Sequence, residues 1–246
     1  MQINGNTILI TGGTSGLGLA FAEEFVKHGN TVIITGRRQD RLDAIQQRIP
    51  GIVVKNSDIA DAAQREELVN WVYANYPSTN VLINNAGVQL AMDLSQPVDP
   101  KRVYAEIDTN LVGPIHLGSL FTPHLQKQNN PVIINITSGL AWIPAAFMPV
   151  YCATKAAMHS FTLSQRWQLR NTNIQVIEVA PPSVDTELGH DRREDKTQSH
   201  GGIPIAAFIK EAMAALISGE LEAPIGDAKN LRAKGETIFE AFNSRF

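Results

Sequence analysis

Apolar runs of strand length alternate along the chain with segments whose apolar residues recur at helical spacing. The runs lie at 7–10, 31–35, 52–55, 81–84, 132–136 and 174–179, with a weaker seventh run near 222–225. Helical patterns lie between them at 17–28, 39–48, 61–75, 101–126 and 152–170. This alternation predicts an α/β fold in which a parallel sheet carries helices on both faces. No linker or repeat divides the pattern, so residues 1–246 are expected to form a single domain.

Polar and glycine-rich segments follow the ends of these predicted strands. They are Thr11–Gly18, Gly36–Arg38, Asp58, Asn85–Gly87, Ser138 and Pro181–Thr186. In open parallel sheets the ligand binds past the carboxyl ends of the strands, where the strand order reverses. The sequence therefore predicts one shared site along this edge of the sheet.

Composition excludes several classes of protein. The net charge of −3 argues against a nucleic-acid binder, which usually shows a basic excess. A single cysteine allows no intrachain disulfide, and no signal-peptide pattern or membrane-length apolar run is present. We therefore expect a cytoplasmic protein with no membrane partner.

A glycine-rich turn follows the first predicted strand. The sequence TGGTSGLG, residues 11–18, lies between the strand and a helical pattern that ends near Gly29. Glycines let a pyrophosphate approach the backbone, and the helix N-terminus offers free N–H groups. No Gly-Lys-Ser/Thr follows, so this is not a Walker loop. The turn predicts dinucleotide binding.

A serine, a tyrosine and a lysine form the candidate catalytic group. Tyr151 and Lys155 are four residues apart, so a helix places both on one face, and Ser138 lies thirteen residues upstream of the tyrosine. Tyrosine ordinarily keeps its proton until about pH 10, and a nearby ammonium stabilises the phenolate. Tyrosine then becomes usable as an acid or base near neutrality. The serine hydroxyl could bond the oxygen of a carbonyl or alcohol.

Five motifs appear in an order that resembles the short-chain dehydrogenase/reductase family. They are TGGTSGLG at 11–18, NNAG at 84–87, Asn110, Ser138 and YCATK at 151–155. Within that family, ITSGLA, PVYCATKAA and APPSVDT resemble bacterial DltE-type oxidoreductases. The resemblance implies a Rossmann-like doubly wound domain with seven strands in the order 3-2-1-4-5-6-7. It also implies an oxidoreductase acting on a carbonyl compound or secondary alcohol, and a substrate lid at 186–204. The residues of that segment, which are polar and charged, indicate a mobile surface loop as the alternative.

The resemblance also assigns roles to individual residues. The catalytic set it implies is Ser138, Tyr151, Lys155 and Asn110, with Tyr151 as the acid/base. The cofactor-binding set is Gly12, Thr14, Ser15, Gly16, Leu17, Gly18, Arg37, Arg38, Asp58, Ile59, Asn85, Ala86, Gly87, Tyr151, Lys155, Pro181, Val184 and Thr186. Asp58 would contact adenine, although it is alternatively an N-cap, a role that Asp61 fits better.

The residues after the second predicted strand favour NADP(H) over NAD(H). An NAD site usually places an acid there, but here Gly36 is followed by Arg37 and Arg38. A guanidinium can make paired contacts with a 2′-phosphate, which a carboxylate would repel. The alternative is that both arginines are solvated charges at the start of a helix.

Asn110 lies inside the helical pattern at 101–126, close to Gly113 and Pro114. A proline inside a helix frees a carbonyl and bends the axis, so a local defect is expected here. In the family the matching asparagine holds a water that extends a proton relay from the lysine. The alternative is an ordinary interhelical hydrogen bond.

Other functions are less well supported by the sequence. The six histidines lack metal-ligand spacing, so no metal site is expected, and no Gly-x-Ser-x-Gly elbow indicates a hydrolase. Cys152 is turned off the face of Tyr151 by the helical step. The main alternative is a regulator that binds NADP(H) without turnover; an epimerase of the extended branch is disfavoured by length.

The substrate side of the predicted site is apolar. The residues expected to line it are Leu140, Trp142, Ile143, Phe147 and Pro182, which suit a small apolar carbonyl or alcohol. Pro182 replaces a glycine that is common in the family, and it removes an N–H donor. Apolar residues on several faces of the helices at 101–126 and 152–170 predict a homodimer or homotetramer.

Overall fold

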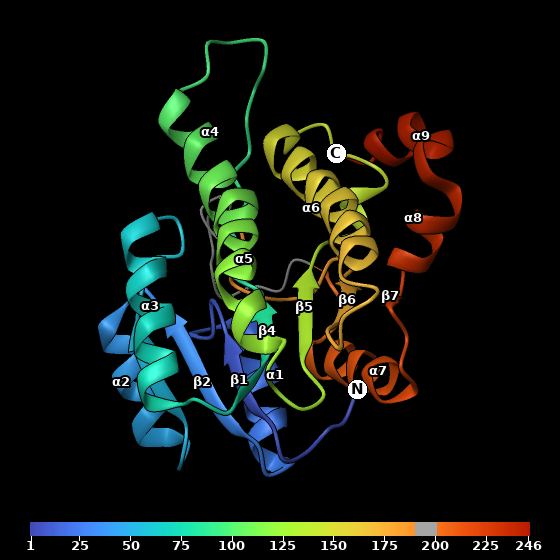
Figure 1. Cartoon of the computed structure of the whole chain (residues 1–246). Coiled ribbons are helices and arrows are strands. Elements are labelled where there is room, and N and C mark those ends of the chain that lie inside the picture. The colour runs from blue at the N-terminus through green and yellow to red at the C-terminus, as the bar shows by residue number, and fades with distance from the viewer. Residues whose placement is uncertain (190–200) are drawn as a thin grey trace.

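Seven strands form one parallel sheet in the order β3-β2-β1-β4-β5-β6-β7 within the described part of the chain (Figure 1). The computed structural model describes residues 1–189 and 201–246. The strands are β1 Thr7–Ile10, β2 Thr31–Gly36, β3 Val53–Asn56, β4 Thr79–Asn84, β5 Val132–Ile136, β6 Gln175–Ala180 and β7 Glu222–Pro224. The predicted fold class and strand order are confirmed.

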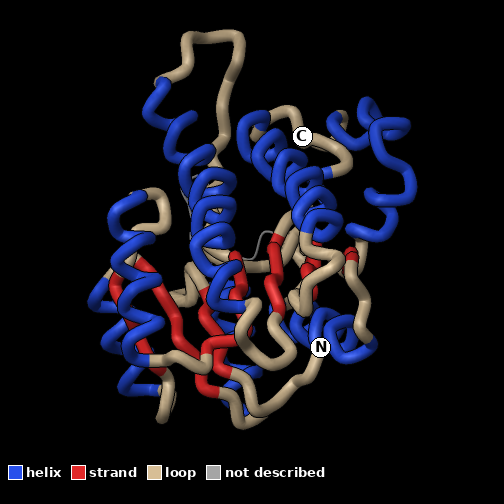
Figure 2. The backbone as a smooth tube through the Cα atoms, viewed as in Figure 1, coloured by secondary structure: helices blue, strands red, loops and turns tan. Residues whose placement is uncertain are grey.

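Helices cover both faces of this sheet (Figures 1 and 2). They are α1 Gly16–Lys27, α2 Gln39–Arg48, α3 Ala62–Asn75, α4 Pro100–Ile107, α5 Gly113–Leu125, α6 Pro149–Gln168, α7 Ile205–Ser218, α8 Ala228–Lys234 and α9 Phe239–Asn243. The sequence patterns did not predict α7, α8 or α9. Helix α6 begins three residues earlier than expected because Pro149 starts its first turn.

Alternate residues of each strand feed two separate apolar cores. Ile8 and Ile10 of β1 pack with Phe21 and Phe25 of α1, in a core to which α2 and α7 also contribute. Leu9, between them, faces the opposite core, formed with α3 and α5. Because side chains alternate across a strand, a sheet buried on both faces has nearly continuous apolar strands. Packing on both faces holds the sheet in place, and the polar residues that follow the parallel strands lie along one edge of it.

The helical pattern at 101–126 is not one helix. A π-helical turn, Asp108–Val112, separates α4 from α5, and the Gly113 N–H bonds the Asp108 carbonyl five residues back. Pro114 has no N–H to give the Asn110 carbonyl. A Cβ on Gly113 would lie 2.7 Å from the Ile59 carbonyl oxygen, so only glycine fits there. The predicted local defect at Asn110 is confirmed.

The predicted lid, 186–204, falls mostly on residues 190–200, which lie outside the described residues. Its flanks meet, because Val184 and Ile203 form a parallel bridge. The Asp185 N–H donates to the Ile203 carbonyl at 2.9 Å, and the Ile203 N–H donates to the Ser183 carbonyl at 2.9 Å. Among the described helices, none is both long and apolar enough to cross a membrane.

Candidate active site

Helix α6 presents Tyr151 in its first turn and Lys155 one turn later. Both side chains are 5% exposed. The Lys155 ammonium donates a hydrogen bond to the Ile136 carbonyl at 2.9 Å, and its Nζ lies 5.7 Å from the centroid of the Tyr151 ring. The end of β5 thus fixes the lysine beside the tyrosine, as the helical spacing predicts.

Burial changes the acid–base character of Lys155. Desolvation lowers its pKa from 10.5 to about 8, because a buried ammonium loses its hydration. At neutral pH the group is still a cation, held in a low-dielectric environment beside a phenol. Such an environment strengthens its interaction with a phenolate.

Ser138 lies at the end of β5, directly before a short 3₁₀ turn, Gly139–Ala141. Its hydroxyl oxygen accepts a hydrogen bond from the Leu140 N–H at 3.1 Å and caps that turn. The Gly139 N–H donates to the Pro181 carbonyl at 2.8 Å. Ser138 is therefore fixed where β5 and β6 end, and its own O–H hydrogen remains available to donate.

Asn110 lies at the centre of the π-helical turn and is 1% exposed. Its amide bonds the backbone of Val88 twice, accepting from the N–H and donating to the carbonyl, each at 2.8 Å. It also donates to the Thr154 hydroxyl at 3.2 Å. A Cβ on Gly87 would lie 3.4 Å from Asn110 Oδ1 and 3.9 Å from Lys155 Nζ. Asn110, Lys155 and the NNAG segment therefore converge.

The glycine turn packs against the NNAG segment without room for side chains. A Cβ on Gly12 would lie 2.7 Å from Ala86 Cα, and one on Gly18 would lie 2.4 Å from Asn85 Nδ2. Gly12 and Gly16 also have positive φ angles of 67° and 55°. Ser15 precedes α1 without a side-chain cap, and no acidic residue lies in its first turn. This helix end suits a pyrophosphate.

Thr11 organises this region, although the sequence motifs assign it no specific contact. Its hydroxyl oxygen accepts from the N–H groups of Asn85 and Ala86 at 3.0 and 3.1 Å. The Asn85 amide in turn donates to the carbonyls of Thr11 and Gly12 at 2.9 and 3.1 Å. The position of Thr11 directly after β1 is the feature of the sequence that could have indicated this role.

At the predicted adenosine end, charged side chains are exposed and already paired. Arg37 Nη1 lies 3.6 Å from Asp58 Oδ2, and Arg38 Nη1 lies 3.8 Å from Glu187 Oε2. Arg38 also donates to the Thr14 hydroxyl at 3.4 Å. Asp61 caps α3 through the Gln64 N–H, as predicted.

Other predicted cofactor contacts lie near the same edge. Ile59 is 5% exposed and packs in the core shared with α3 and α5, while Leu17 packs against the opposite core. Thr186 lies against the glycine turn, since a Cβ on Gly16 would be 3.4 Å from Thr186 Cβ. Val184 is 7% exposed and anchors the start of the segment predicted as a lid.

The C-terminal helix α9 reaches the predicted substrate side, which the sequence did not reveal. Asn243 accepts from the Ala146 N–H at 2.6 Å and donates to the Pro144 carbonyl at 3.0 Å. Phe242 packs against the buried cluster that contains Tyr151. Figure 1 shows α9 beside the start of α6.

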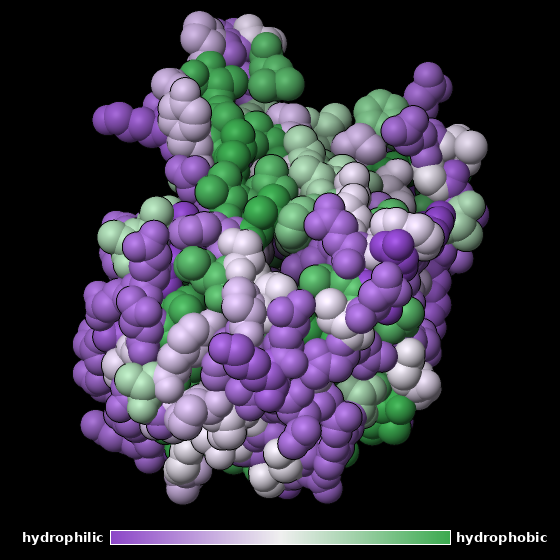
Figure 3. All heavy atoms as spheres, viewed as in Figure 1, coloured by the Kyte–Doolittle hydropathy of each residue, from purple (hydrophilic) through white to green (hydrophobic). Residues whose placement is uncertain are grey.

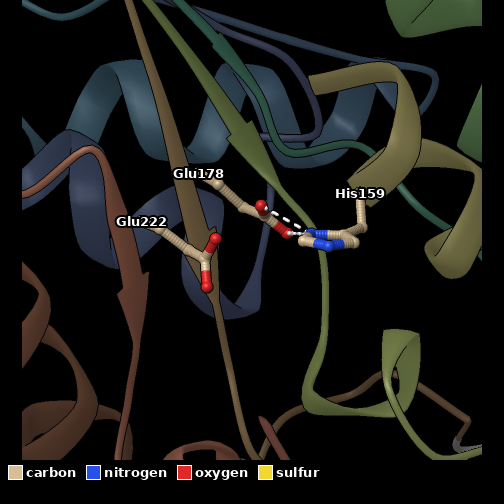
Figure 4. A group of neighbouring side chains, drawn as sticks. All are labelled: His159, Glu178 and Glu222. Carbon is tan, nitrogen blue, oxygen red and sulfur yellow. Dashed lines mark hydrogen bonds and ion pairs between the residues drawn. The ribbon is translucent and has the colours of Figure 1, made fainter. Parts of the chain in front are cut away.

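Two other groups bear on the chemistry. Cys152 is 2% exposed, and burial raises its pKa to about 11, so its thiol is unreactive at neutral pH. His159, Glu178 and Glu222 place potential ligand atoms within 4.8 Å of one another (Figure 4). Sequence spacing could not show this cluster, because its members come from α6, β6 and β7.

The chain is similar to known proteins over its full length. The sequence pattern described as "short chain dehydrogenase" matches residues 6–197. The "Uncharacterized oxidoreductase DltE" of Bacillus subtilis (strain 168) is 43% identical over 250 residues, covering 100% of this chain and 99% of that protein. The "NADP-dependent 3-hydroxy acid dehydrogenase YdfG" of Salmonella typhi is 33% identical over 214 residues, 84% of this chain and 86% of that one.

A solved structure supports the same relationship. A short chain dehydrogenase from Burkholderia cenocepacia J2315, crystallised with NADP, aligns with a TM-score of 0.83 and 27% sequence identity. The alignment covers 100% of this chain and 98% of that one. Another solved chain of this fold was crystallised with NAD, so the fold alone does not select between the two cofactors.

Proposed function

The chain belongs to the short-chain dehydrogenase family, and we propose that it transfers hydride between NADP(H) and a small apolar carbonyl compound or secondary alcohol, with Tyr151 as the acid/base. The observation that carries this proposal is the buried Lys155 ammonium held beside the Tyr151 ring. A desolvated cation next to a phenol is costly to stability and useful for proton transfer.

The residues can be assigned distinct steps in carbonyl reduction. When bound, NADPH supplies the hydride that reaches the carbonyl carbon. The Tyr151 phenol donates its proton to the carbonyl oxygen, and the Ser138 hydroxyl donates a hydrogen bond to the same oxygen. Lys155 stabilises the phenolate that remains, and Asn110, through a water, helps to return a proton to the tyrosine. Alcohol oxidation uses the same groups in reverse.

The residues present fit a dinucleotide. The glycine turn has no room for side chains, and the N-terminus of α1 carries no acid or capping side chain, so a pyrophosphate meets free N–H groups there. Arg37 and Arg38, 62% and 47% exposed at their side chains, suit a 2′-phosphate and support NADP(H) over NAD(H). Asp58 and Ile59 would border adenine, and Pro181, Val184 and Thr186 the nicotinamide end.

The substrate would lie between the end of β5 and the start of α6. Leu140 and Phe147 pack there against the cluster that holds Tyr151, which supports an apolar substrate. Two observations support a lid in the segment 186–204. Val184 and Ile203 form a bridge that brings the two ends of the segment together, and Thr186 borders the glycine turn.

A homodimer or homotetramer is part of the proposal. Apolar side chains gather on the face drawn in Figure 3 over α4 and α5. Exposed apolar side chains also occur on the π-helical turn and on α6, where Val112, Leu163 and Trp167 are 41%, 43% and 68% exposed. Contiguous apolar patches often mark protein–protein interaction sites. Sedimentation velocity at micromolar concentration should show a species at least twice the 26.9 kDa chain mass.

A non-catalytic NADP(H) regulator on the same fold is the alternative. Such a regulator gains nothing from a buried lysine with a lowered pKa, whereas proton transfer does. This difference favours the enzyme.

The experiment is a panel of ketones, aldehydes, diketones and quinones assayed for NADPH consumption. We expect turnover on at least one compound, and a loss of about 10²–10⁴-fold in kcat for Tyr151→Phe. Tyr76→Phe, a matched change remote from the site, should retain wild-type turnover. Binding of NADPH without turnover of any compound would favour the regulator instead.

A further inference from the structure

A carboxylate buried in the sheet links the two elements that carry the catalytic residues. Glu178 of β6 is 0% exposed. Its Oε1 accepts a hydrogen bond from the Thr137 hydroxyl at 2.7 Å. His159 Nδ1 lies 3.0 Å from Oε1 and 2.9 Å from Oε2 of the same carboxylate. Dashed lines in Figure 4 mark both contacts.

The partners of Glu178 lie next to the catalytic residues in the chain. Thr137 directly precedes Ser138 at the end of β5, and it is 2% exposed. His159 lies on α6 four residues after Lys155, hence one turn further along the same face. One carboxylate therefore joins the strand end that carries Ser138 to the helix that carries Tyr151 and Lys155.

Aromatic and charged side chains continue this link toward the substrate side. The ring of Trp142 lies edge-on to His159, with centroids 5.4 Å apart. The Arg232 guanidinium lies 5.5 Å from the centroid of Trp142 and donates to Glu222 at 2.6 Å. Trp142 follows the 3₁₀ turn that Ser138 caps, so the same network also contacts the residues around the serine.

The cluster of His159, Glu178 and Glu222 would also suit a divalent cation by residue type. Glu222 and Glu178 are register partners on neighbouring parallel strands, so both carboxylates face the same side. Each carboxylate already has a partner, however: Glu178 has Thr137 and His159, and Glu222 has Arg232. The contacts favour a hydrogen-bonded link over a metal site.

We propose that Glu178 is a positioning residue that, through Thr137 and His159, fixes Ser138 relative to Tyr151 and Lys155. The inference rests on the proposed function, because it concerns the same catalytic set. A rigid connection is needed since misplacing a catalytic group by about 1 Å can reduce the rate about 10²-fold. The predicted consequence is a loss of kcat with little change in cofactor binding.

The link is tested by removing one hydroxyl. Thr137→Val removes the hydroxyl that donates to Glu178 and keeps nearly the same side-chain shape, whereas Thr137→Ser keeps a hydroxyl at this position. We expect Thr137→Val to lower kcat about tenfold with the Kd for NADPH unchanged, and Thr137→Ser to recover most of it. Hydrogen exchange should rise in Ser138–Trp142 for the valine variant and return to the wild-type rate for the serine variant.

Thr162→Val is the matched control. Thr162 is 0% exposed and accepts from the Asn135 amide at 3.0 Å, so it also joins β5 to α6, but away from Ser138. Thr162→Val should lower thermal stability about as much as Thr137→Val does, but its kcat should stay within about twofold of the wild-type value. Equal kcat losses in Thr137→Val and Thr162→Val would reduce Thr137 to a structural residue and overturn the proposal.

The remaining outcomes separate this proposal from others. If wild-type protein turns over no compound, the proposed function fails, and hydrogen exchange at Ser138–Trp142 still decides the link. If hydrogen exchange in Ser138–Trp142 is the same in Thr137→Val as in the wild type, the proposed link through Glu178 is overturned. Stoichiometric zinc or manganese in purified protein, lost in Glu178→Gln, would show a metal site in place of the hydrogen-bonded link.

Discussion

The proposed catalytic end and the proposed adenosine end of the site are built in different ways. Ser138, Tyr151 and Lys155 are 7%, 5% and 5% exposed. At the other end the side chains of Arg37 and Arg38 are 62% and 47% exposed, at 3.6 and 3.8 Å from carboxylates. One end is buried and fixed by short hydrogen bonds, whereas the other consists of solvated charges.

This difference indicates what each end can tolerate. A buried charge costs free energy whenever its environment fails to compensate it, so changes at the catalytic end should affect both rate and stability. Exposed ion pairs contribute about 0–1 kcal/mol, so their arginines can exchange partners at little cost. Changes at the adenosine end should therefore alter cofactor choice and leave the fold intact.

Among the changes that test this difference, the largest effect is expected from Lys155→Met, which removes the buried charge at similar volume. At pH 7 kcat should fall about 10²-fold, because the phenolate of Tyr151 loses its cation. The Lys155 pKa is lowered to about 8 in the folded protein, so the unfolded chain binds more protons between pH 8 and 10.5. Stability from this group therefore rises with pH in that window, by about 3 kcal/mol.

Urea unfolding at several pH values measures this linkage. The difference in unfolding free energy, wild type minus Lys155→Met, should increase from pH 8 to pH 10.5. Lys229 is an exposed control whose pKa is raised by its hydrogen bond to Glu211, so Lys229→Met should give no increase in that window. A flat difference for Lys155→Met would show that its ammonium is hydrated.

A smaller effect is expected from Arg37→Asp at the adenosine end. The introduced aspartate would repel a 2′-phosphate, and the hydrogen bonds that the arginine would make to that phosphate are lost. Hydrogen bonds to charged groups contribute about 1.5–3 kcal/mol. The ratio of kcat/KM for NADPH over NADH should therefore fall at least tenfold, with the unfolding midpoint nearly unchanged. Arg48→Asp reverses the same charge at the far end of α2, where Arg48 pairs with Glu23, and should leave the ratio unchanged. An unaltered ratio in Arg37→Asp would remove the basis for NADP(H) preference.

The sequence predicts the fold well because its signals are local. Most strands are short apolar runs, although β7 is only Glu222–Pro224. The glycine turn, Asn110 and Tyr151 belong to short motifs that can be identified from the sequence without knowing any long-range contact. Helix α7 carries the same local signal, because Phe208, Ile209, Ala212, Met213 and Leu216 recur at helical spacing on one buried face, so its residues could have predicted it.

The parts of the site that the sequence could not predict depend on long-range contacts. Glu178 is one acid in an apolar strand, and its partners Thr137 and His159 are 41 and 19 residues away. Asn243 contacts Ala146 across 97 residues. No local period indicates such pairs, since they follow from the order of β5, β6 and β7 and from the return of α9.

The smallest expected effect is that of Glu187→Gln, which tests how freely the adenosine end exchanges partners. Glu187 Oε2 lies 2.6 Å from Arg41 Nη1 and 3.8 Å from Arg38 Nη1. A 2′-phosphate must compete with this carboxylate for Arg38, so its removal should tighten NADPH binding about twofold to fivefold and leave NADH binding unchanged. Fluorescence titration of both cofactors measures the difference. Glu67→Gln, which breaks a comparable exposed pair with Lys55, should change neither affinity. Equal tightening of NADPH and NADH would instead show that Glu187 acts on access to the whole site, because NADH carries no 2′-phosphate to compete for the arginine.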